Sequence, residues 1–177
     1  MIRSCLVKES YSYYELNNYS GEANNRQVTI DKQQKTNNNH MEFKHSVPVQ
    51  LRFNDADALG HVNNSVYFSF YDLGKTEYFK TINGGVMPKE IDIVVAHAEV
   101  DFIMPVFLTD EIAVQTMVSE IGNKSFELMQ RIIDTKNNVV KCRCKTVMVG
   151  FDFKNNCSKL ISDEWRNAIS AFEGVKF

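Results

Sequence analysis

The stretch that decides the fold reads Arg52-Phe-Asn-Asp55-Ala-Asp57-Ala-Leu-Gly60-His61-Val-Asn63-Asn64-Ser-Val-Tyr67. It places two carboxylates, a glycine, a histidine, asparagines and a tyrosine between an alternating apolar segment and a helical pattern. Loops held by regular elements are where binding and catalytic groups concentrate. We therefore expect a strand, a functional loop and a helix, in that order.

The flanking segments support this order. Apolar residues alternate with polar ones from Val47 to Phe53, which predicts a half-buried strand. Asn63 or Asn64 can cap the following helix, and residues 83–85, Asn-Gly-Gly, are expected to end it. The apolar stripe of this helix is expected to contain Val66, Phe70, Leu73, Tyr78 and Ile82.

The rest of the chain predicts more strands and a short helix. Alternating or continuous apolar runs cover residues 94–102, 112–121, 124–135 and 139–153. Their short connections imply antiparallel hairpins. Ser162 can then cap a C-terminal helix that carries Trp165, Ile169 and Phe172. One amphipathic helix against one antiparallel sheet makes a two-layer α+β domain.

Residues 1–43 differ in composition from the rest. They are rich in Asn, Gln, Ser, Lys and Tyr, and apolar periodicity is confined to residues 28–30. Such a segment buries too little surface to offset its ordering entropy. We expect a disordered or weakly ordered N-terminal extension at 1–43 and one folded domain at 44–177. A start codon at Met41 is a further hypothesis, which N-terminal sequencing of the native protein would test.

Composition excludes several classes of protein. The formal net charge is −2, and no basic-aromatic motif favours nucleic-acid binding. No apolar run is long enough for a transmembrane helix or a signal peptide, so we expect a cytoplasmic protein. The cysteines form no CxxC pair and have no neighbouring histidine, which favours reduced thiols over a zinc site. They are Cys5, Cys142, Cys144 and Cys157.

The residue types in the loop favour chemistry on an electrophilic carbonyl. Gly60 allows a positive φ or a close backbone approach. The start of the following helix presents unpaired N–H groups and the positive end of the dipole, which can stabilise an oxyanion. A carboxylate opposite this helix start could attack the carbonyl or activate water against it.

The pattern D-x-D-x-x-G-H-V-N-N-x-x-Y resembles the hydroxybenzoyl-CoA thioesterase branch of the hotdog superfamily, and the resemblance extends over about residues 45–172. It implies the hotdog fold, a five-stranded antiparallel sheet wrapped around one long helix, here with a short C-terminal helix. It also implies pairing of subunits through an edge strand, Ile93 to Met104, as a homodimer or a dimer of dimers with active sites at the interface. The implied substrates are acyl-CoA or acyl-carrier-protein thioesters, hydrolysed without cofactor or metal.

The resemblance assigns roles by position in the motif. Asp57 matches the catalytic carboxylate, as nucleophile or general base, and the backbone N–H of Asn64 matches the group that polarises the thioester carbonyl. Asp55 is expected to hold the loop instead. Residues expected to contact substrate are Gly60, His61, Val62, Asn63 and Tyr67. For His61, Asn63 and Tyr67 a structural role (hydrogen bonding, capping and packing, respectively) is the alternative.

Binding of the CoA phosphates has separate candidates. The first candidate is the turn at Lys124 and Ser125, which offers backbone N–H groups, the lysine cation and the serine hydroxyl. The row Lys141, Arg143 and Lys145 on one strand face forms a second, unless it is a solvated face.

Two other functions compete with the thioesterase. Fold alone does not determine function, so a non-catalytic acyl-CoA-binding or regulatory hotdog protein is an alternative. A hotdog dehydratase is a third possibility, but its differently spaced histidine and acidic partner are not seen in this sequence.

Overall fold

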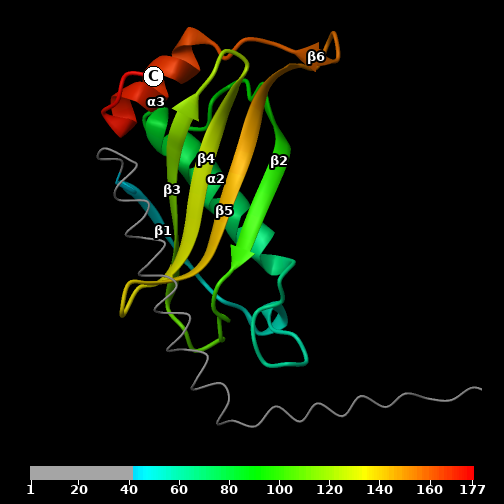
Figure 1. The fold of residues 1–177 in the computed structure, drawn as a ribbon, viewed down its shortest axis with the longest axis vertical. Helices are drawn as coiled ribbons and strands as arrows, with labels where there is room; N and C mark the ends of the chain where they lie inside the picture. The colour runs from blue at the N-terminus through cyan, green and yellow to red at the C-terminus, as the bar shows by residue number, and fades with distance from the viewer. Residues whose placement is uncertain (1–41) are drawn as a thin grey trace, which may run out of the picture. The chain divides into compact units, whose positions relative to one another are not determined.

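The computed structural model describes residues 42–177 (Figure 1). The predicted N-terminal extension therefore lies outside the described residues, apart from Glu42 and Phe43. Within the described range, no helix is both long enough and apolar enough to cross a membrane.

The strands form one antiparallel sheet in the order β1-β3-β4-β5-β2, with the short β6 paired to the end of β5. β1 and β2 are the edges, and the successive strands β3, β4 and β5 are joined by tight turns, as the short connections predicted. The strands are β1 (His45–Val49), β2 (Ile93–Phe102), β3 (Ile112–Ile121), β4 (Ser125–Asp134), β5 (Val139–Asp152) and β6 (Cys157–Ser158).

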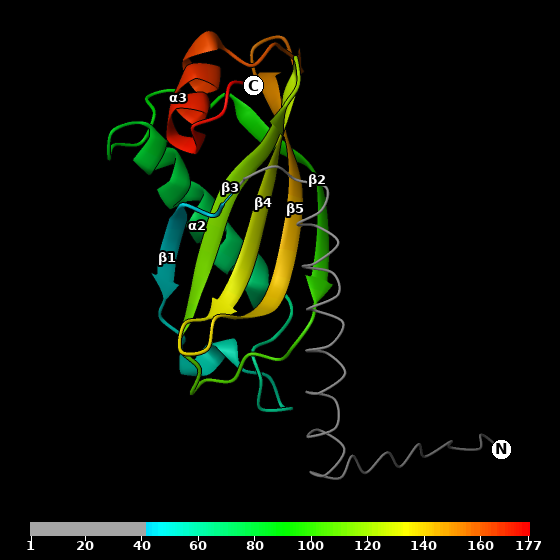
Figure 2. The same ribbon diagram turned by 60° about the vertical axis from the view of Figure 1, so that its left-hand side comes forward.

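The long helix α2 (Val66–Ile82) runs along one face of this sheet, which curves around it (Figures 1 and 2). The short helix α3 (Asp163–Glu173) lies beside the C-terminal end of α2. Its N-cap is Ser162, whose Oγ accepts the Trp165 N–H at 3.3 Å. The α+β arrangement predicted from the sequence is therefore confirmed.

The first strand is shorter than its alternating pattern predicts. β1 ends at Val49, and Phe53, predicted as its last inward residue, is 87% exposed. Phe53 instead begins the 3-10 turn η1 (Phe53–Asp55). The Asp55 carboxylate accepts the backbone N–H of Arg52 at 2.7 Å, and this local bond favours a turn over continued pairing. The prediction was wrong beyond Val49.

The buried face of α2 also differs from the predicted stripe. Leu73 is 39% exposed, whereas Tyr67, Tyr71 and Phe79 are buried. Phe70 and Tyr78 of the predicted stripe are buried, so the prediction holds in part: the buried face includes them, extends beyond them to the three residues above, and leaves out Leu73. Gly74 marks the closest approach, because a Cβ there would lie 2.5 Å from a Val114 methyl group on β3.

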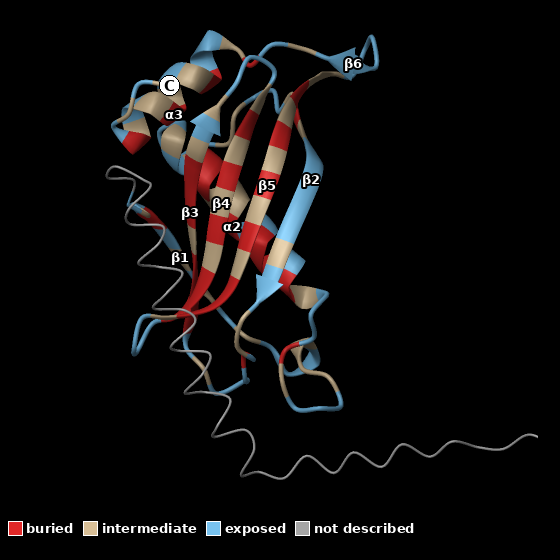
Figure 3. Cartoon of the chain, in the orientation of Figure 1, coloured by how far each residue is buried: buried red, intermediate tan, exposed pale blue. Residues whose placement is uncertain are grey.

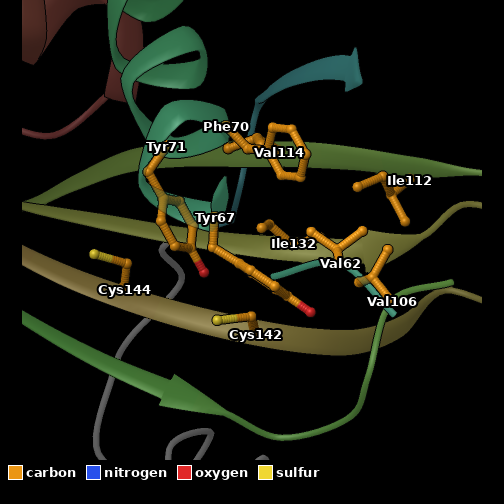
Figure 4. Packing of buried hydrophobic residues seen from close by; sticks show 10 residues of the cluster. All are labelled: Val62, Tyr67, Phe70, Tyr71, Val106, Ile112, Val114, Ile132, Cys142 and Cys144. Carbon is orange, nitrogen blue, oxygen red and sulfur yellow. The ribbon is translucent and has the colours of Figure 1, made fainter. Parts of the chain in front are cut away.

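The core has two main parts along α2. One lies under the first turns of the helix, where Tyr67 and Tyr71 point onto the sheet near Cys142 and Cys144 (Figure 4). The other lies at the far end, against α3. Both thiols are free and buried on the helix-facing side of β5. Most of the outer edge strand β2 is exposed (Figure 3).

Candidate functional site

The loop between η1 and α2 folds back on itself. The N–H of Asn63 donates to the carbonyl of Asp55 at 2.9 Å, and the N–H of Asp57 donates to the carbonyl of His61 at 3.0 Å. The turn closes with the Gly60 N–H on the Asp57 carbonyl at 3.0 Å, and Gly60 has a φ of 82°. This positive φ is the conformation for which glycine was expected. The result is a small hairpin with Asp57 and His61 side by side.

The carboxylate of Asp57 is partly accessible. Its Oδ1 accepts the backbone N–H of Leu59 at 2.8 Å. Its Oδ2 lies 3.7 Å from Nδ1 of His61, and the two side chains are 25% and 32% exposed, respectively. A carboxylate oxygen can accept more than one hydrogen bond. Asp57 therefore keeps acceptor capacity towards solvent and is not enclosed in an internal ion pair.

The start of α2 leaves a backbone donor open. Oδ1 of Asn63 accepts both the N–H and the hydroxyl of Ser65, at 2.9 and 2.8 Å. Asn63 therefore closes a turn just before the helix, and the N-cap position is Ser65 rather than the predicted Asn63 or Asn64. The N–H of Val66 donates to the Asn63 carbonyl at 2.9 Å. The N–H of Asn64 donates to no other described residue. An exposed donor thus stands at the positive end of the helix dipole.

His61 is held from two sides. Its ring meets that of Phe107 edge to face, with centroids 6.4 Å apart, and the same two residues form an isolated β-bridge. Asp57 lies on the other side of the ring. The sequence did not identify Phe107, because it lies far along the chain in a segment marked only by the end of a strand at Pro105.

Two of the predicted substrate contacts belong to the core within this chain. Val62 is 1% exposed, and its N–H donates to the Val106 carbonyl at 2.8 Å. Tyr67 is 2% exposed and packs edge to face on Phe102, with ring centroids 5.2 Å apart. Burial raises the pKa of Tyr67 to about 12, so the phenol is neutral at physiological pH. Within the described residues Tyr67 therefore has the packing role that was stated as its alternative.

Lys124 and Ser125 are not close to Asp57 within one chain. Ile112, at the start of β3, pairs with Val49 just before the site loop, while the turn with Lys124 follows the other end of β3. A strand of 10 residues spans about 33 Å. Nζ of Lys124 lies 3.4 Å from the carbonyl of Ser158.

The second candidate for CoA binding is not a row of free cations. Lys141 lies 3.3 Å from the carboxylate of Asp110, and its side chain is only 10% exposed. Lys145 pairs with Glu127 at 2.5 Å. Both lysines are already used within the chain, and Lys141 is not on a solvated face. Among residues 42–177, no cluster of three or more His, Cys, Asp or Glu side chains is placed to hold a metal ion.

The fold and the loop define the class of protein. An antiparallel sheet curved around one long helix, with a short C-terminal helix, is the hotdog fold that the motif implied. The chain belongs to the thioesterase-like superfamily, whose family model matches residues 51–169.

Individual relatives agree with this family. The uncharacterized protein YsmA of Bacillus subtilis is 30% identical over 80 residues, which are 45% of this chain and 54% of YsmA. The match therefore spans about half the length of that relative. The acyl-CoA thioester hydrolase YbgC of Escherichia coli is 27% identical over 96 residues, 52% of this chain and 72% of YbgC.

A solved structure covers more of the chain. The thioesterase of Thermus thermophilus, solved with coenzyme A and Zn, is 30% identical and superposes with a TM-score of 0.65. The match covers 75% of this chain and 96% of the Thermus protein. The names of YbgC and of the Thermus structure support a thioester hydrolase.

Proposed function

We propose that this protein hydrolyses acyl-CoA thioesters to a free acid and CoA, with Asp57 as nucleophile or general base and the N–H of Asn64 as oxyanion donor. The names of YbgC and of the Thermus structure support the substrate class. The observation that carries the proposal is that one folded-back loop presents both a partly exposed carboxylate and, at the start of the helix, an N–H that no described residue accepts.

The chemistry follows from these two groups. If Asp57 acts as general base, it takes a proton from water while the water oxygen bonds to the acyl carbon. The carbonyl oxygen gains negative charge, which the Asn64 N–H and the helix dipole stabilise. The C–S bond then breaks, the thiolate leaves and takes up the proton. If Asp57 attacks directly, its oxygen bonds to the acyl carbon, the C–S bond breaks and the CoA thiolate leaves, which gives a mixed anhydride. Water then hydrolyses the anhydride to the free acid and the Asp57 carboxylate, and the proton released is taken up by the thiolate.

His61 and the assembly extend the proposal. The imidazole lies 3.7 Å from the carboxylate, and this distance supports a role for His61 in orienting Asp57 or relaying its proton. We also propose pairing of two copies through the edge strand β2, as a homodimer or a dimer of dimers. Antiparallel pairing would bring the opposite end of a second sheet, with Lys124 and Ser125, towards this site. Light scattering on the purified protein tests the assembly.

Acyl-carrier-protein thioesters are an alternative form of the substrate. They present the same thioester on a phosphopantetheine arm, so the Asp57 site would act on them by the same steps. A cytoplasmic location, reaction without cofactor or metal, and the substrate contacts of Gly60 and His61 stay predictions.

The deciding experiment measures thiol release from a panel of acyl-CoAs, from acetyl to palmitoyl and including an aromatic thioester. The variant Asp57→Asn should lose about 10³-fold in kcat, as removal of a general base typically does. Asp55→Asn is the matched control, because its amide oxygen can still accept the Arg52 N–H. Equal rates for Asp57→Asn and wild type would remove Asp57 from the mechanism. Tight binding of acyl-CoA without thiol release would favour the non-catalytic binder.

A further inference from the structure

Lys141 is a charged side chain buried beside the candidate site. It lies on β5 with 8% of its surface exposed. Its Nζ lies 3.3 Å from Oδ2 of Asp110 and donates to the carbonyl of Pro105 at 3.3 Å. Its backbone carbonyl accepts the N–H groups of Ile103 and Met104 at 3.0 and 2.9 Å. One residue therefore holds both ends of the segment 103–110, which joins β2 to β3.

The segment 103–110 in turn supports the site loop. The carbonyl of Val106 accepts the N–H of Val62 at 2.8 Å, and Phe107 pairs with His61 through both a β-bridge and ring contact. The carboxylate of Asp110 that meets the lysine also accepts the N–H of Phe107, at 3.0 Å and through the same oxygen. The ion pair and the support for His61 thus share one atom.

The placement of Asp57 depends on this support. Asp57 accepts hydrogen bonds from the N–H groups of Leu59 and Gly60 within its own turn. Among the described residues, its bond to the other side of the loop is the one that its N–H donates to the carbonyl of His61, at 3.0 Å. His61 and Val62 are in turn the loop residues bonded to the segment 103–110. If segment 103–110 moves, His61 and Val62 move with it, and the hydrogen bond to His61 then shifts Asp57.

We propose that Lys141 and Asp110 are positioning residues for the reaction: their ion pair fixes segment 103–110, and through His61 it fixes the carboxylate of Asp57. This inference rests on the proposed function. Burial of an ion pair costs desolvation that an apolar pair avoids, so the pair is poorly explained by stability alone. Catalysis is sensitive to small errors in position, because a misplacement of about 1 Å can cost about 10²-fold in rate.

The test compares three variants of the full chain. Lys141→Met keeps the aliphatic stem and the backbone hydrogen bonds but removes the charge. Lys141→Arg restores a cation. Lys145→Met is the matched control. It also removes a lysine of β5 from an ion pair, but the partner is Glu127 on β4 and not a residue of segment 103–110. For each variant, kcat and KM are measured with the best acyl-CoA of the panel, together with backbone amide exchange of Asp57 and Val62.

Positioning predicts a separation of these readouts. Lys141→Met should lower kcat by about 10- to 100-fold with little change in KM, and it should speed exchange at Asp57 and Val62. Lys141→Arg should recover most of the rate, and Lys145→Met should match wild type in both. A normal kcat in Lys141→Met, or unchanged exchange at the two amides, would overturn the proposal. If wild type releases no thiol, the proposed function fails, and the exchange data alone decide whether the ion pair positions the loop.

Discussion

The two ends of α2 carry carboxylates in opposite surroundings. We call the loop 52–65 the entrance end and the region around α3 the closed end. At the entrance end, Asp57 is partly exposed and accepts one backbone N–H. At the closed end, Glu173 is 6% exposed, and a single oxygen accepts the hydroxyl of Tyr78 at 2.6 Å and the N–H of Val118 at 3.0 Å.

The difference separates a group available for chemistry from one used for structure. The Glu173 carboxylate joins α3 to α2 and to β3, and burial raises the pKa of its partner Tyr78, with a further contribution from the negative charge of Glu173. The Asp57 carboxylate is held only by its own loop, so it can exchange solvent for substrate. Each prediction below tests one side of this contrast.

The largest expected effect is on packing at the closed end. Phe79 is 3% exposed, and its ring centroid lies 4.9 Å from that of Trp165. Phe79→Ala should therefore lower the free energy of unfolding by about 3–5 kcal/mol. The matched change at the entrance end, Phe53→Ala, removes an 87% exposed ring and should stay within about 0.5 kcal/mol. Urea unfolding measures both. A large cost at Phe53 would mean that a second copy covers the entrance end.

The next effect concerns the open donor at the entrance end. Asn64→Pro removes the N–H, and proline is tolerated at a helix start. The variant should lose about 10²–10³-fold in kcat, as expected for loss of one oxyanion donor. Asn64→Ala keeps the N–H and is the control. If the alanine variant loses as much as the proline variant, the side chain is the important group and the oxyanion assignment is wrong.

A smaller effect is expected from the carboxylate at the closed end. Glu173→Ala removes the one oxygen that the Tyr78 hydroxyl and the Val118 N–H share, and the free energy of unfolding should fall by about 1–3 kcal/mol. Glu173→Gln retains an acceptor and should cost less. Thermal melts give the stability, and thiol release measured well below the melting temperature should match wild type for both variants. Loss of rate without loss of stability would contradict the structural role.

The smallest effect is a pH dependence of stability. Burial lowers the pKa of His45, with the charge of Glu77 acting in the opposite direction, and its Nδ1 has no hydrogen-bond partner among the described residues. At pH above the ordinary histidine pKa, His45 is neutral in both states. As the pH falls below that value, the unfolded chain takes up a proton that the folded one resists, so stability is lost towards the folded-state pKa.

His45→Phe should therefore lose less stability than wild type between about pH 7.5 and about pH 5.5. Equal pH dependence in the wild type and His45→Phe would show that His45 is not the group responsible.

Local patterns predicted most of the elements of this fold. The turns that end α2, the hairpins of β3, β4 and β5, and the Ser162 cap of α3 each depend on neighbouring residues, so they were found where expected. The end of β1 was missed because the Asp55–Arg52 bond competes with strand pairing. The exposure of Leu73 was missed because a helical period does not say how far a curved sheet will wrap around the helix, although Phe70 and Tyr78 of the same stripe are buried.

The candidate site shows the same division. The sequence by itself determined which residues share the loop, including the turn at Gly60, because these are contacts between neighbours in the chain. Only the tertiary structure decided that Glu173 meets Tyr78 and that Lys141 meets Asp110, and that Phe107 braces His61. These pairs are far apart in sequence, so no period or spacing encodes them. They form when the sheet closes on the helix and brings together groups from distant parts of the chain, among which most buried polar groups find a partner.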